Sequence, residues 1–260
     1  MLIIFFLICF GASVVGAICG IGGGVIIKPL LDSFGVLDVS VINFLSGCTV
    51  LSMTMYSVIK SKVSKNSQFE PNTGLPLALG AAVGGLIGKW LFSYIKSLST
   101  DQNKVGAVQA VCLLIITIGT LAYTLFKNKI KTRQIENVSV CIIIGVFLGI
   151  LSSFLGIGGG PINLVVLFYF FSMGIKNATE NSLYIIFFSQ TASIISTIIS
   201  GTVPAFSWIT LLVMAIGGIF GAILGRYLNK RIQHKTVNKL FIGLMVVMIL
   251  INFYNINKFI

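Results

Sequence analysis

Long apolar runs separated by short polar loops make up almost the whole chain. The hydrocarbon core of a bilayer is about 30 Å thick, and a helix needs roughly 20 consecutive apolar residues to cross it. The sequence supplies that length several times. Hydrophobic residues account for 56% of the 260 residues and charged residues for only 9%, which leaves too little polar surface to cover a water-soluble globule of this size. The sequence therefore predicts a polytopic membrane protein.

The membrane spans are expected to be helices. Their apolar residues are continuous, whereas the strands of an outer-membrane barrel alternate apolar and polar residues over about ten positions. The first stretch, Met1 to Cys19, has no basic region and no clear small-residue cleavage site, so we expect mature protein rather than a signal peptide. The predicted fold class is an all-α polytopic membrane protein with lipid as its surroundings.

The polar residues argue against other classes of protein. Lysine and arginine outnumber acidic residues by 18 to 6, but they lie almost entirely in loops, where topology explains them better than nucleic-acid binding does. The five cysteines lie inside apolar runs without a CxxC pattern, and the single histidine, His234, lies in a basic loop. The acidic residues all lie near loops, whereas an enzyme would cluster such groups. We expect no catalytic residue, no metal, no cofactor and no nucleic-acid partner.

An internal repeat divides the chain into two halves. The pentapeptide GIGGG occurs at residues 20–24 and again at 156–160. Two further matches follow in the same order: a glycine ladder before Lys89 and before Arg226, and an Asn-Lys pair before the last apolar run of each half. The ladders are Gly80, Gly84 and Gly88, then Gly217, Gly221 and Gly225. We predict two transmembrane repeats, residues 1–130 and 131–260, which together form one transport domain.

Each half contains four apolar units, and the first unit of each is too long for a single span. The units cover residues 2–34, 40–59, 74–95 and 105–126, then 138–172, 181–200, 206–225 and 237–256. GIGGG interrupts the first unit of each half, and its backbone freedom disfavours a continuous helix. Each first unit is therefore expected to be a broken helix or a re-entrant hairpin.

The basic loops favour the re-entrant alternative. Lysine and arginine in short loops concentrate on the cytoplasmic side. Three loops carry this signal, with Lys60, Lys62 and Lys65, then Lys127, Lys129, Lys131 and Arg133, then Arg226, Lys230, Arg231 and Lys235. All three face the cytoplasm only if each GIGGG unit enters and leaves on the same side. The two halves are then inverted relative to each other.

The glycine triplets are candidate parts of a substrate site. Non-helical backbone within a membrane is tolerated only where protein or a water-lined cavity satisfies it. The residues that follow, Val25 to Leu31 and Pro161 to Phe170, can each begin a half-helix, and free N–H groups at such N-termini attract anions. Pro161 suits the first helical turn, where its missing N–H costs nothing. The competing interpretation is that GIGGG only permits close helix packing.

Polar residues in the second span of each half allow two interpretations. Ser46, Ser182 and Gln190 are equally suited to donate hydrogen bonds to an oxyanion or to join helices, whereas their polar neighbours are expected to join helices. Lys28 is charged and has Leu164 at the matching position of half two. It either acts on substrate or extends toward the loop that carries Asp32. The glycine ladders are expected to be packing contacts, with Lys89 and Arg226 extending to the membrane interface.

The two GIGGG motifs, each closing a long first segment in one of two four-unit halves, resemble the sulfite exporter TauE/SafE family over essentially the whole chain. The resemblance implies secondary transport of sulfite, a sulfonate or a related sulfur anion across a bacterial-type inner (plasma) membrane, with the glycine motifs beside the substrate path. The alternative is a transporter or channel for a different small anion or metabolite on the same scaffold. The candidate substrate-binding residues are Gly22, Gly23, Gly24, Lys28, Ser46, Gly158, Gly159, Gly160, Pro161, Ser182 and Gln190.

Overall fold

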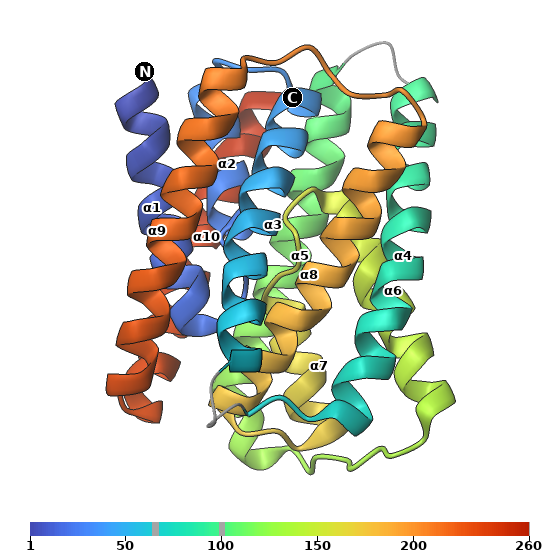
Figure 1. The fold of residues 1–260 in the computed structure, drawn as a ribbon, viewed down its shortest axis with the longest axis vertical. Coiled ribbons are helices and arrows are strands. Elements are labelled where there is room, and N and C mark those ends of the chain that lie inside the picture. The colour runs from blue at the N-terminus through green and yellow to red at the C-terminus, as the bar shows by residue number, and fades with distance from the viewer. Residues whose placement is uncertain (64–67, 99–101, 260) are drawn as a thin grey trace.

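The computed structural model describes residues 1–63, 68–98 and 102–259, and within these ranges it is entirely helical, with no strand (Figure 1). The first half contributes α1 (Leu2–Cys19), α2 (Gly24–Phe34), α3 (Val39–Val63), α4 (Pro71–Leu98) and α5 (Gln102–Phe126). A short 3-10 turn, η1 (Lys127–Lys129), follows. The second half contributes α6 (Val138–Leu155), α7 (Pro161–Phe171), α8 (Ile175–Ile199), α9 (Trp208–Arg231) and α10 (His234–Phe259).

Eight of the described helices are long and apolar enough to cross a membrane. The two exceptions, α2 and α7, have 11 residues each and follow the two GIGGG segments. An 11-residue helix is about 16 Å long, which is roughly half of the hydrocarbon thickness. The expectation of an all-α protein with several membrane-spanning helices is therefore confirmed for the described residues.

The bundle has two chemically different ends. Both chain termini lie at one end, the upper end in Figure 1, which we call the terminal end. The segment after η1 crosses the opposite end, which we call the basic end. Near this end, the Arg226 guanidinium donates to the Ser57 carbonyl oxygen of α3 at 2.8 Å, and the Lys127 ammonium donates to Asn238 Oδ1 of α10 at 2.7 Å. Burial lowers the pKa of the Lys127 ammonium. Lys65 lies outside the described residues.

The glycine ladders hold the two halves together. On one side α4 packs along α6, and on the other α9 packs along α1, so both contacts join different halves. The facing pairs are Gly80 with Ile142, Gly84 with Val146 and Gly88 with Ile150, then Gly217 with Phe6, Gly221 with Phe10 and Gly225 with Val14. A Cβ atom added at any of these glycines would lie 3.0 Å or less from the carbonyl oxygen opposite. The predicted packing role of the ladders is confirmed.

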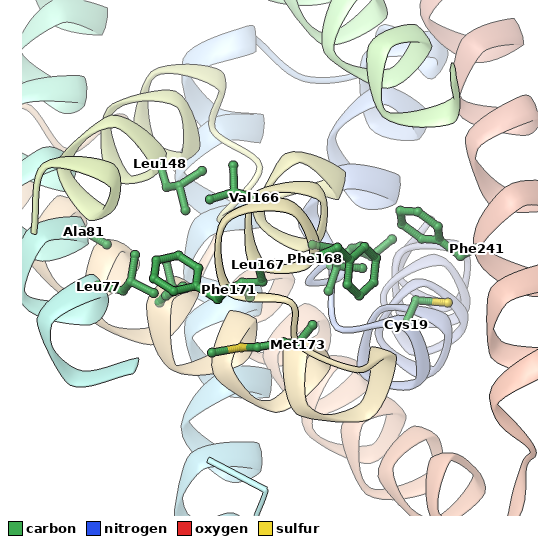
Figure 2. Packing of buried hydrophobic residues seen from close by; sticks show 14 of the residues in the cluster. Cys19, Leu77, Ala81, Leu148, Val166, Leu167, Phe168, Phe171, Met173 and Phe241 are labelled. Atoms are coloured by element: carbon green, nitrogen blue, oxygen red, sulfur yellow. The ribbon is translucent and has the colours of Figure 1, made fainter. Parts of the chain in front are cut away.

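The short helix α7 lies within the largest apolar cluster. Figure 2 shows Val166, Leu167, Phe168 and Phe171 of α7 between Leu77, Ala81 and Leu148 on one side and Cys19 and Phe241 on the other. All of these side chains are buried. Because α7 is apolar on every side, with buried positions all around it, it is enclosed by protein rather than by lipid.

We expect Gly84→Leu and Gly221→Leu to reduce the yield of folded protein severely, because the new side chain would collide with the backbone of α6 or α1. Overpacking of this kind costs about 1–3 kcal/mol or more. The measurement is the monodisperse fraction in detergent by size-exclusion chromatography. Gly119→Leu is the matched control, since nothing lies within 4 Å of a Cβ atom at that helical glycine. An equal loss for Gly119→Leu would contradict the packing explanation.

Candidate functional site

The two GIGGG segments adopt matching backbone conformations at their first two glycines. Gly20 and Gly156 close α1 and α6 with φ values of 75° and 66°, in the left-handed region that favours glycine. Gly22 and Gly158 repeat this conformation with φ values of 74° and 72°. The first two glycines of each motif are therefore required by backbone geometry. The next position differs between the halves, since Gly23 has φ −69° whereas Gly159 has φ 134°, a conformation that favours glycine.

The two motifs contact each other although 136 residues separate them in sequence. A Cβ atom at Gly24 would overlap the carbonyl oxygen of Ile157, and one at Gly22 would lie 3.9 Å from the carbonyl oxygen of Gly158. Both Ile21 and Ile157 are buried. The motifs thus bring two stretches of irregular backbone together in the interior of the protein.

One face of α3 and one face of α8 cover the motifs. Along α3, Asn43 lies against Gly156 and Val50 against Gly158. Along α8, Thr179 lies against Gly20 and Ile186 against Gly22 and Gly159. Positions 43 and 179 differ by 136 residues, as do 50 and 186 and the two motifs. Each motif is therefore covered in an equivalent way, and each of the two spans contributes a stripe with the i, i+7 spacing of one helical face.

Ser46 and Ser182 occupy equivalent positions within these two faces, three residues after Asn43 and Thr179 respectively. Both side chains are fully buried at 0% exposure, and neither hydroxyl has a hydrogen-bond partner. A buried polar group without a partner costs about 1–3 kcal/mol, so such groups in native proteins call for an explanation such as a ligand or water. Neither hydroxyl therefore takes part in the hydrogen bonds that hold the described helices together.

Two further polar residues lie beside the motifs and are absent from the candidate residues taken from the sequence. Asn163, in the first turn of α7, is 1% exposed and neither its Nδ2 nor its Oδ1 has a partner. Its amide lies 3.3 Å from the position that a Cβ atom of Gly159 would take. The hydroxyl of Ser13 on α1 lies 3.0 Å from the corresponding position at Gly23 and is also buried without a partner. For Asn163, the available signal was a lone polar residue three positions after a glycine triplet in an apolar run.

Gln190 lies beside the second motif. Its Nε2 donates to Ser152 Oγ at 3.4 Å, and its Cγ lies 3.3 Å from the position of a Cβ atom at Gly158. Together with Asn43 and Gly156 it lines a small cavity of about 20 Å³. A cavity of this size holds about one water molecule.

Other polar side chains of α3 and α8 form hydrogen bonds with carbonyl oxygens of their own helix. Thr49 and Ser52 donate to carbonyl oxygens four residues earlier, at 2.8 and 2.9 Å. Asn181 donates to the Asn177 carbonyl oxygen at 2.9 Å. These bonds lie within single helices, so they do not join helices as expected, but they distinguish these residues from Ser46 and Ser182.

The N-termini of α2 and α7 begin at the glycine triplets. Gly23 and Gly160 are their N-cap residues, and neither helix has a side-chain cap. Pro161 is the first residue of α7, as its chemistry predicts. The third N–H group of each helix is satisfied within its first turn, because the Ile26 and Asn163 N–H groups donate to the carbonyl oxygens of Gly23 and Gly160 at 3.0 and 3.1 Å. The N–H groups before them lack intrahelical acceptors, so each N-terminus carries partial positive charge toward the motifs.

Lys28 is not directed at the glycine motifs. Its ammonium pairs with the Asp32 carboxylate at 2.8 Å, one turn further along α2, and both side chains are buried. The pair is neutral overall, and Asp32 Oδ1 has no partner. Leu164 and Phe168 occupy the matching positions of α7, so half two has an apolar pair in the same place.

A polar network lines a cavity at the basic end. Glu180 accepts hydrogen bonds from the Ser61 hydroxyl and, at 2.6 Å, from the Gln68 backbone N–H. Arg226 pairs with Glu180 at 3.4 Å, so it does not extend freely toward the interface as expected. The cavity beside this pair measures about 290 Å³ and is also lined by Thr179, which contacts the first motif.

No group of three or more His, Cys, Asp and Glu side chains suited to hold a metal ion occurs in the described part of the chain. The candidate site is therefore built from glycine backbone, uncapped helix N-termini and neutral hydroxyl and amide groups. Such a site binds through N–H and O–H donors, which suit an anion.

Known proteins similar to this chain are membrane transporters by name. The sequence model of the family described as sulfite exporter TauE/SafE matches residues 5–251. The probable membrane transporter protein YunE of Bacillus subtilis is 26% identical over 247 residues, which cover 87% of this chain and 88% of YunE. The probable membrane transporter protein MJ0441 of Methanocaldococcus jannaschii is 23% identical over 249 residues, covering 92% and 90%. No solved structure matches.

We expect Lys28→Leu and Asp32→Leu each to destabilise the protein, because each leaves an uncompensated buried charge, at a cost of about 3–5 kcal/mol. The double variant should recover at least half of this loss, since half two already carries an apolar pair there. Thermal unfolding in detergent measures all three variants. Additive losses in the double variant would contradict this account. A folded double variant that has lost anion affinity would instead support a direct substrate role for Lys28.

Proposed function

Because the chain belongs to the TauE/SafE sulfite exporter family of membrane transporters, we propose that it is a secondary transporter of a small sulfur-containing anion, either sulfite or a sulfonate. The observation that carries the proposal is the meeting of the two GIGGG motifs under the faces of α3 and α8 that also contain Ser46 and Ser182, two fully buried hydroxyls without partners. The substrate site is formed by Gly22, Gly23, Gly24, Gly158, Gly159, Gly160 and Pro161 with Ser46, Ser182 and Gln190 around them. The scaffold is a multi-pass membrane protein.

The chemistry of this centre favours an oxyanion. Sulfite and sulfonates present several oxygen acceptors on one sulfur atom, and the centre offers backbone N–H groups, hydroxyls and the Asn163 amide as donors. The positive ends of α2 and α7 add attraction without a charged side chain. Since the donors are neutral, an anion can leave as well as bind, which transport requires.

The arrangement of the chain supports two inverted repeats, residues 1–130 and 131–260, within one transport domain. Each GIGGG segment joins two helices whose outer ends are close together. Residues 133 and 135, just before α6, form backbone hydrogen bonds with residues 169 and 170 near the end of α7. In half one, Phe5 near the start of α1 and Leu31 near the end of α2 share one apolar cluster. We infer re-entrant hairpins that enter from opposite sides, α1–α2 from the terminal end and α6–α7 from the basic end.

With this topology, we propose that the basic end faces the cytoplasm and that the protein lies in the inner membrane. Single cysteines introduced into a cysteine-free variant test it in intact cells. We expect Lys129→Cys and Lys230→Cys to resist a membrane-impermeant thiol reagent, whereas Thr202→Cys at the terminal end reacts. Labelling of Lys230→Cys but not of Lys129→Cys would contradict the inverted arrangement.

Transport by purified protein in vesicles tests the function. The panel is sulfite, thiosulfate, methanesulfonate and sulfate, with a small cation of similar size as control. Sulfite or methanesulfonate should be transported fastest. A site built of backbone amides and hydroxyls distinguishes anions by size, charge and hydration. A preference for another small anion would therefore support the proposed site and change only the proposed substrate. Transport of the cation in preference to every anion would overturn the proposal.

Within that assay, Ser46→Ala and Ser182→Ala should each weaken affinity for the transported anion about tenfold or more, because each removes one hydrogen bond to a charged acceptor. Neither change should lower folded yield, since neither hydroxyl has a protein partner. Ser52→Ala is the matched control on the same helix, because its hydroxyl already donates to the Cys48 carbonyl oxygen. Equal affinities in all three variants would remove both serines from the site.

A further inference from the structure

A hollow of about 300 Å³ opens at the terminal end beside α4. Lys89 and Lys96 line it, together with the hydroxyls of Ser40, Ser93, Ser97 and Thr202. No acidic residue is found among the described residues of its lining. Two ammonium groups and four hydroxyls without a carboxylate give this hollow the chemistry of an anion-binding surface.

Lys89 connects this hollow to the interior. With Phe92, it lines both the outer hollow and the small inner cavity that contains Asn43, Gly156 and Gln190. The inner cavity therefore reaches the first glycine of the second motif. Lys89 therefore borders both spaces, so an anion in the outer hollow and one beside the second motif would each lie next to its side chain.

Within the described part of the chain, Lys89 has no ion-pair partner. Its ammonium lies 5.1 Å from the centre of the Phe92 ring, and no carboxylate pairs with it among the described residues. The side chain is only partly exposed. An unpaired ammonium inside a membrane protein is costly and attracts an anion strongly where water is scarce.

The equivalent position at the other end of the bundle is built differently. Arg226 follows the second glycine ladder as Lys89 follows the first, and it lines a cavity of similar size, about 290 Å³. Its guanidinium, however, is paired with Glu180 at 3.4 Å. Of these two equivalent cations, therefore, only Lys89 is available to a diffusing anion.

We propose that Lys89 is the anion-binding residue of an entrance site, which holds a small sulfur oxyanion before it reaches the second glycine motif. This site rests on the proposed function, because it supplies the central site with substrate from the terminal end. The Lys89 ammonium provides a point charge, and the hydroxyls of Ser40 and Ser93 in the outer hollow provide neutral donors.

The test uses the full-length protein in vesicles and methanesulfonate as the probe. Lys89→Gln should raise KM for methanesulfonate about tenfold or more, since it removes a charged donor, while Lys89→Arg should stay within about threefold of the unmodified protein. Raising the salt concentration should raise KM of the unmodified protein more than that of Lys89→Gln. Lys104→Gln is the matched control, being an exposed lysine at the same end outside both cavities.

A second measurement on the unmodified protein does not depend on the folding of a variant. Acylation of lysines in detergent, mapped by mass spectrometry, should slow at Lys89 but not at Lys104 when methanesulfonate is added. A KM for Lys89→Gln within twofold of the unmodified protein, or Lys89 acylation that methanesulfonate does not slow, would overturn the entrance site and leave the central site standing. Absence of transport and of binding for every anion of the panel would overturn the proposed function itself.

Discussion

Close approach of backbone to backbone at glycine is the constraint on which the rest of this structure depends. Within a membrane, irregular backbone survives only where protein encloses it. The two GIGGG segments place such backbone in the interior, where Val50 and Ile186 cover it from α3 and α8. Those spans stay in place because α4 and α9 lie directly against the backbones of α6 and α1 through the glycine ladders. The ladders therefore hold the two halves together around the motifs.

Glycine spacing made the architecture predictable, whereas the site was predictable only in part. A ladder with i, i+4 spacing marks a packing face whatever the partner helix is, so its role followed from the sequence. The difference between Ser46, which lacks a partner, and Ser52, which bonds to its own helix, depends on the rotation of α3 relative to the motifs. Neither composition nor spacing fixes that rotation. The pairing of Arg226 with Glu180 joins residues 46 positions apart on different helices, which no local pattern reveals.

Lys28 illustrates a local signal with two meanings. An intramembrane lysine suggests contact with substrate, but Asp32 stands one helical turn away, at the spacing that pairs opposite charges on a helix. The structure forms that pair. The two halves therefore have equivalent positions with different side chains. Asn43 matches Thr179, and the charged pair of α2 matches Leu164 and Phe168 of α7. The polar side chains around the motifs are thus distributed unequally between the two halves of the chain.

The packing of α9 along α1 has a consequence for how the protein is made. A ribosome releases α1 first, and α9 begins at Trp208, so the partner of α1 is synthesised only after most of the chain. Until then, the α1 face that receives Gly217, Gly221 and Gly225 is open to lipid or to the insertion machinery. The α4–α6 contact joins segments separated by only 39 residues and can form much earlier. The contact between α4 and α6 can therefore form before the contact between α1 and α9, and α10 packs against α5 and α2 later still.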